Sequence, residues 1–87
     1  MSDELTADEI AAHFSAMGDS VTLINATIAD DTEALAVNGS AAEVKLMVTR
    51  NTDHLEIQAT HSWYSDSSKS KTPYTNAVTA GKAYVAG

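Results

Sequence analysis

A long segment that begins at Ser40 places the strongest constraint on the fold. Ser40 and Glu43 form a capping box, in which the side chain of each residue bonds to the backbone N–H of the other at the start of a helix. Beyond it, apolar and small side chains recur every three or four residues, which is the spacing of one helical face. This stripe consists of Val44, Met47, Val48, Asn51, Leu55 and Ala59. The pattern predicts a single helix over residues 41–60.

Leu46 and Ile57 would lie on nearly the opposite side of that helix, because eleven residues make close to three turns. A helix that is apolar on two faces is covered on both by its own chain or uses one to contact another molecule. Residues 20–37 could fold back as the internal cover. The competing interpretation is a β-hairpin over residues 44–60, with alternating apolar residues and a turn at 51–53. We therefore expect an all-α bundle of three or four helices, with an α+β fold that contains this hairpin as the alternative.

The start of the chain carries a second capping box, formed by Thr6 and Glu9. Apolar residues at helical spacing follow it as far as Met17. Gly18 then indicates the end of this helix, which we expect over residues 7–17. His13 would lie in its C-terminal half, where a positive charge is mildly favourable.

The stretch that follows is compatible with two structures. Residues 21–28 have the composition of a strand, whereas their apolar members also fit one face of a helix that is capped at Ser20 or the residue before it. Residues 30–32 indicate a turn or a new helix cap, and Asn38 with Gly39 indicates a break.

The C-terminal part begins with a polar run of serine and lysine over residues 65–71, which predicts an exposed loop. Thr72 and Pro73 then predict a helix start, with proline at the first helical position. Gly81 weakens this helix by about 1 kcal/mol relative to alanine, and it permits close packing. Residues that can share one face of the helix are Tyr74, Ala77, Val78, Gly81 and Val85.

Length and charge restrict the partners. The 87 residues have room for one domain, and much of the 44% apolar content is alanine, so the core is thin and a partner would add stability. With 12 acidic and 5 basic residues, the net charge of −7 opposes binding to nucleic acid or to an anionic membrane. The acidic residues 1–4 do not resemble a signal peptide, and no apolar run approaches the roughly 20 residues that span a bilayer.

No set of residues predicts catalysis or a bound cofactor. The chain has no cysteine, no Gly-x-Ser-x-Gly turn and no phosphate-binding loop. His54 and His61 would lie about 10.5 Å apart along one helix, too far to share a metal ion. The acidic residues 30–33 lack the order of a calcium loop. We therefore expect no enzyme activity, no metal, no cofactor and no small-molecule substrate.

The candidate functional residues are instead those that would contact a protein partner or a second copy of the chain. Arg50 either pairs locally with Asp53 or recognises a carboxylate on a partner. The aromatic pair at 63–64 either fills the core or anchors an interface. The predicted contact residues are Leu46, Arg50, Ile57, Trp63 and Tyr64.

The C-terminal half also resembles a family. The segment Arg-Asn-Thr-Asp-His-Leu-Glu-Ile at 50–57, the aromatic pair at 63–64 and the Ala-Gly-Lys-Ala-Tyr segment at 80–84 resemble, in that order, small helical bacteriophage-encoded proteins of uncharacterised role. This chain departs from their pattern at Thr52, where an apolar residue is expected, and in the Ser/Lys-rich run, which looks like an insertion. The resemblance implies a helical C-terminal half and a phage origin, with no assigned activity.

From these observations we expect a small non-enzymatic accessory or structural protein that acts through protein–protein contacts. It would reside in the virion, docked on a capsid or tail component. The alternative is an acidic soluble regulator or inhibitor in the cytoplasm of the infected bacterial host, which occupies a basic site on a host protein.

Overall fold

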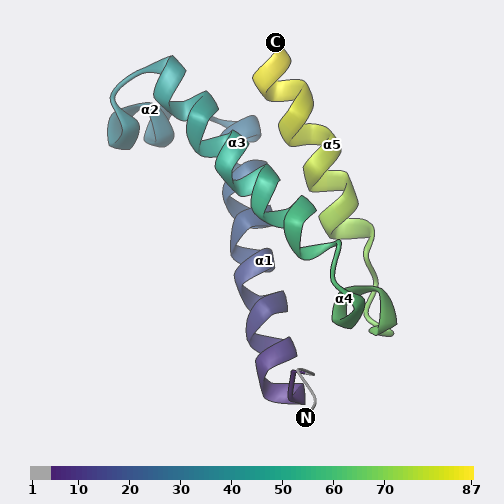
Figure 1. Ribbon diagram of the computed structural model, residues 1–87. Coiled ribbons are helices and arrows are strands. Elements are labelled where there is room, and N and C mark those ends of the chain that lie inside the picture. Colours follow the sequence, from purple (N-terminus) through teal and green to yellow (C-terminus); the bar gives the residue numbers. More distant parts are fainter. Residues whose placement is uncertain (1–4) are drawn as a thin grey trace.

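The computed structural model describes residues 5–87, and these form five helices with no strand among them (Figure 1). The prediction of an all-α bundle is confirmed. The hairpin alternative is wrong, because the whole segment from Ala41 to Gln58 is one helix. The acidic residues 1–4, which do not resemble a signal peptide, lie outside the described part. The helices are α1 (Ala7–Ala29), α2 (Thr32–Asn38), α3 (Ala41–Gln58), α4 (Ser62–Asp66) and α5 (Thr72–Ala86).

The N-terminal helix begins as predicted and ends much later. Thr6 Oγ1 accepts a hydrogen bond from the backbone N–H of Glu9 at 3.1 Å, and Glu9 Oε1 accepts one from the N–H of Thr6 at 2.8 Å. Gly18 does not end this helix, which contradicts the expected boundary. A glycine inside a helix costs about 1 kcal/mol, whereas burying a large apolar side chain stabilises by about 1.5–3 kcal/mol. Met17 and Ile24, on either side of Gly18, are both completely buried, so packing outweighs the glycine.

Because α1 extends to Ala29, two further expectations, for Ser20 and for His13, are wrong. Ser20 is not a cap, because it lies inside α1, where it is buried and its Oγ lies 2.9 Å from Nδ1 of His54 on α3. His13 is not near a helix C-terminus, since α1 continues for sixteen residues beyond it, to Ala29. Its imidazole stacks on the indole of Trp63 instead, with 5.0 Å between ring centroids. The strand alternative for 21–28 is also excluded.

The short helix α2 is set between two turns that the sequence indicated. Asp30 Oδ1 accepts hydrogen bonds from the hydroxyl and the backbone N–H of Thr32, at 2.7 and 3.0 Å. These two bonds, the hydroxyl first, lower the pKa of Asp30 below its ordinary value. The helix ends at Gly39, which adopts a left-handed φ of 94° that favours glycine. No residue of α2 is fully buried, so only half-buried side chains hold this helix to the bundle.

The long helix α3 begins at the predicted residue, where Ser40 Oγ accepts the N–H of Glu43 at 3.2 Å. The reciprocal bond from the Ser40 N–H to the Glu43 side chain, which would complete the predicted capping box, is not formed. Its buried residues are Val44, Val48, Thr52 and Leu55. The apolar centre of the predicted stripe is therefore confirmed. The observed buried face is rotated slightly about the helix axis from the predicted one, because Thr52 is buried whereas Asn51 and Met47 are only half-buried. Thr52 satisfies its hydroxyl within the helix by donating to the carbonyl of Val48 at 2.8 Å.

Helices α1, α3 and α5 lie side by side, each in contact with the other two, while α2 and α4 lie at opposite ends of this bundle (Figure 1). The predicted inner face of α5 is confirmed, with Val78 and Val85 half-buried and its other members buried. The predicted position of proline is one residue off, because Pro73 is the second helical residue rather than the first. The core consists of Phe14, Met17, Ile24, Val48, Leu55, Tyr64, Tyr74 and Ala77.

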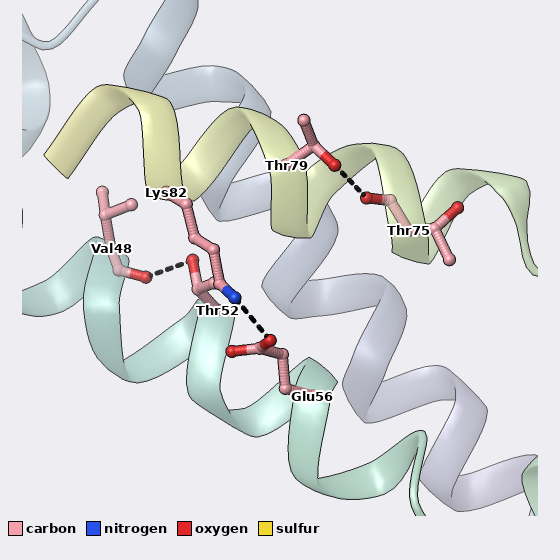
Figure 2. A network of polar contacts seen from close by, with 6 residues as sticks. All are labelled: Val48, Thr52, Glu56, Thr75, Thr79 and Lys82. Atoms are coloured by element: carbon pink, nitrogen blue, oxygen red, sulfur yellow. Dashed lines mark hydrogen bonds and ion pairs between the residues drawn. The ribbon is translucent and has the colours of Figure 1, made fainter. Parts of the chain in front are cut away.

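The contact between α3 and α5 is close because one helix has a glycine where they meet. Gly81 faces Thr52, and a Cβ built on Gly81 would overlap the Thr52 hydroxyl. One turn away, Lys82 Nζ on α5 lies 2.7 Å from Glu56 Oε2 on α3, which gives an exposed ion pair beside this contact (Figure 2). The ion pair is exposed and contributes little, so the helix spacing depends on the glycine.

The two buried tyrosines, Tyr64 and Tyr74, make the stability of the fold depend on pH in the alkaline range. Burial raises the pKa of Tyr64 and of Tyr74 above the ordinary 10.0, and in Tyr64 the neighbouring Tyr74 raises it further. A group with a raised folded-state pKa contributes stability that is complete below its unfolded pKa and is lost as the pH rises. We expect the melting temperature to fall as the pH rises above about 10. In thermal melts across this range, a variant with both Tyr64→Phe and Tyr74→Phe should fall less steeply; an equal fall would contradict the assignment.

Candidate functional site

One exposed surface lies on the side of α3 that faces away from the bundle. Leu46, Arg50, Asp53 and Ile57 lie there, at spacings of four, three and four residues, and we call this set the α3 outer stripe. Leu46 is 41% and Ile57 59% exposed. The prediction that these two residues lie on the side of α3 opposite its buried stripe is confirmed. Residues 20–37 do not cover them: α1 and α2 both contact α3, yet Leu46 and Ile57 remain exposed.

Neighbouring helices define the limits of the α3 outer stripe. The ion pair between Glu56 and Lys82 marks the side of α3 that faces α5, and the contact between His54 and Ser20 marks the side that faces α1. On a helical projection the stripe lies midway between these two sides. It is therefore turned away from both α1 and α5.

Arg50 does not form the local ion pair that was one of its two interpretations. Within residues 5–87, no ion pair joins Arg50 to Asp53, although the two are three residues apart. Both side chains are exposed. Arg50 and Asp53 thus both lie exposed on the outer stripe without pairing with each other.

The aromatic pair on α4 is divided between two environments. Tyr64 is 6% exposed and stacks on Phe14 with 5.8 Å between centroids, so it fills the core and does not lie on the surface where a partner would contact it. Trp63 is half-buried, stacked on His13 and perpendicular to Phe14, with 5.3 Å between the centroids of the Trp63 and Phe14 rings. The fold thus brings together only Leu46, Arg50 and Ile57 from the predicted contact set; Trp63 lies apart, on α4.

A second surface was not anticipated. A groove of about 300 Å³ lies where α1, α2 and α3 meet, and we call it the α2 groove. Leu23 is 47% and Val37 78% exposed there, and the exposed carboxylates of Asp30 and Glu33 lie beside them. The groove therefore combines an apolar surface with negative charge. Its lining residues are Leu23, Ala26, Thr27, Asp30, Glu33, Ala34, Val37, Asn38 and Met47.

The signal for this groove is visible in the sequence once α1 is known to continue past Gly18. Leu23, Ala26 and Asp30 then recur at three and four residues, which is one helical face. The buried face at the same level is formed by Ser20, Ile24 and Thr27. Because two of those three residues are polar, the apolar residues of 21–28 do not mark this face: Ile24 is buried, whereas Ile28 is 41% exposed.

His54 lies apart from the other two histidines. It meets Ser20 at the α1–α3 contact, while His13 and His61 both stack on Trp63, with 5.0 and 5.9 Å between ring centroids. Across residues 5–87, no three histidine or acidic side chains are grouped so that they could hold a metal ion. None of the described helices is both long and apolar enough to cross a membrane.

No protein family model, no curated protein and no solved structure matches this chain.

Proposed function

We propose that this protein is a non-enzymatic accessory protein of a bacteriophage particle, which docks on a capsid or tail protein through the α2 groove. The observation that carries the proposal is the groove itself, where Leu23 and Val37 remain exposed beside two carboxylates. Exposed apolar surface rimmed by polar residues is typical of a protein contact site. The phage assignment is supported by the resemblance of residues 50–84.

The chemistry of the α2 groove specifies the kind of segment that binds there. Apolar side chains of the partner would cover Leu23, Val37 and Met47, and basic residues flanking them would face Asp30 and Glu33. An amphipathic helix or loop with lysine or arginine at its edges has this character. Since α2 has no fully buried residue of its own, such a partner would also complete the packing of α2.

The acidic groove and the net charge of −7 also suit the second candidate function, a regulator that covers a basic site on a host protein. The two functions place the protein in different compartments of an infected culture. The first requires it in purified particles at a fixed copy number, and the second requires it in the soluble fraction.

The test is quantitative mass spectrometry of purified particles from phage that carry variants of this gene. We expect a constant copy number for the natural sequence. Val37→Asp should lower it at least about tenfold, because the change removes an apolar contact and places a charge where apolar side chains of the partner would cover it. Ala11→Asp, an exposed position near the start of α1, is the matched control and should have no effect. Particles without the protein, from cells whose soluble fraction contains it, would contradict docking on the particle and favour the regulator.

A further inference from the structure

The α3 outer stripe has an internal symmetry. Leu46 and Ile57 are equally far from a point between residues 51 and 52, and so are Arg50 and Asp53. Read in either direction along α3, the stripe therefore presents an apolar residue, two charged residues and an apolar residue. On reversal the two charges exchange places. The residues lie within about 60° of arc, and the two apolar ends are about 16 Å apart along the helix axis.

We propose that the α3 outer stripe is a two-fold interface through which a second copy of this chain binds, with the two α3 helices antiparallel. A two-fold axis at the centre of the stripe sets Leu46 of each copy against Ile57 of the other. The same axis sets Arg50 of each copy against Asp53 of the other. Every residue of the stripe then meets a complementary one.

Charge identifies the second copy as the occupant. The protein carries −7 overall, so most of its surface repels another copy, but the outer stripe contains one positive and one negative side chain and is locally neutral. Arg50 and Asp53 form no ion pair within the described chain, which leaves both for contacts across the axis. A parallel arrangement would set Arg50 against Arg50 and Asp53 against Asp53. Only the antiparallel register matches the apolar and the charged residues together.

The proposed interface does not depend on the proposed function. The outer stripe and the α2 groove share no residue, so a dimer could form whether or not the protein docks on a particle. Contact between two single helices buries less than the ~1,200 Å² of a standard stable interface, so we expect a dimer in the micromolar range.

A charge exchange provides the sharpest test, read by sedimentation equilibrium of the full-length chain. R50D carries two acidic residues on the stripe and D53R two basic ones, so each variant alone should show a dissociation constant raised at least about tenfold. An equal mixture of the two should form a heterodimer, since every charge then meets its opposite. The double variant R50D/D53R should dimerise as the natural chain does.

Two further variants separate loss of the interface from loss of the fold. Leu46→Asp should abolish the dimer while the helical circular dichroism stays unchanged, because Leu46 is not a core residue. Ala11→Asp, at an exposed position outside both the stripe and the α2 groove, should leave the dimer intact. A chain that stays monomeric at about 1 mM would overturn the proposal. So would a dimer whose dissociation constant is unchanged in R50D, or a failure of R50D and D53R to associate when mixed.

Discussion

Gly81→Ala is expected to lower the free energy of unfolding by about 1–3 kcal/mol, even though alanine is the better helix former. The added methyl group would overlap the hydroxyl of Thr52, which is 3% exposed and enclosed between α3 and α5. To make room, the two helices must separate or the Thr52 side chain must rotate and lose its hydrogen bond to the Val48 carbonyl. Chemical denaturation followed by far-UV circular dichroism measures the loss.

The chain contains its own control for this experiment. Gly18 lies inside α1 with no atom near the position of an added Cβ, so Gly18→Ala should raise stability by about 0.5–1 kcal/mol through helix propensity alone. Thr52→Ala combined with Gly81→Ala should recover part of the stability that Gly81→Ala loses, because the overlapping hydroxyl is gone. If Gly81→Ala were as stabilising as Gly18→Ala, α3 and α5 would not pack at this separation.

Leu55→Ala is expected to have the largest effect, a loss of about 2–5 kcal/mol. Leu55 is 1% exposed and belongs to the core cluster that joins α1, α3, α4 and α5. Truncating it removes buried methyl groups and leaves a cavity that the neighbouring aromatic rings fill incompletely. Because a domain of this length has little net stability, a loss of this size would unfold a measurable fraction of the protein at room temperature.

Ile57→Ala is the matched control, because it removes similar apolar atoms two residues away on the same helix. Ile57 is 59% exposed, so the chain's own stability should change by no more than about 0.5 kcal/mol. The two variants should be compared at low protein concentration, where a dimer through the outer stripe contributes nothing. Equal losses in both would contradict the inward position of Leu55 and the outward position of Ile57.

Exposed surface residues could be predicted only where the sequence also predicted the ends of the helix on which they lie. Leu46 and Ile57 were recognised as a second face because the cap at Ser40 fixes the start of α3, and helical geometry then fixes the directions of both. The α2 groove was missed because its residues lie on α1 beyond Gly18 and on α2. Neither segment had an assigned structure, so the faces of Leu23 and Val37 could not be derived.

The sequence by itself determined where α1 and α3 begin and where α2 ends, because a cap or a glycine turn acts over three or four residues that are adjacent in the chain. Thr6 with Glu9, Ser40 with Glu43 and the break at Gly39 all act at this range, and all lie where they were predicted. The apolar spacing along α3 also favoured the helix over the hairpin correctly.

Only the tertiary structure decided whether α1 continues through Gly18, whether Ser20 caps a helix or is buried against α3, and whether Tyr64 faces the core or the solvent. Each outcome depends on burial against residues distant in sequence, such as His54 for Ser20 and Phe14 for Tyr64. A local preference near 1 kcal/mol cannot prevail against the burial of a large side chain such as Met17, worth about 1.5–3 kcal/mol. That burial energy exists only once α1, α3 and α5 have come together, which is why no single segment of the sequence could reveal it.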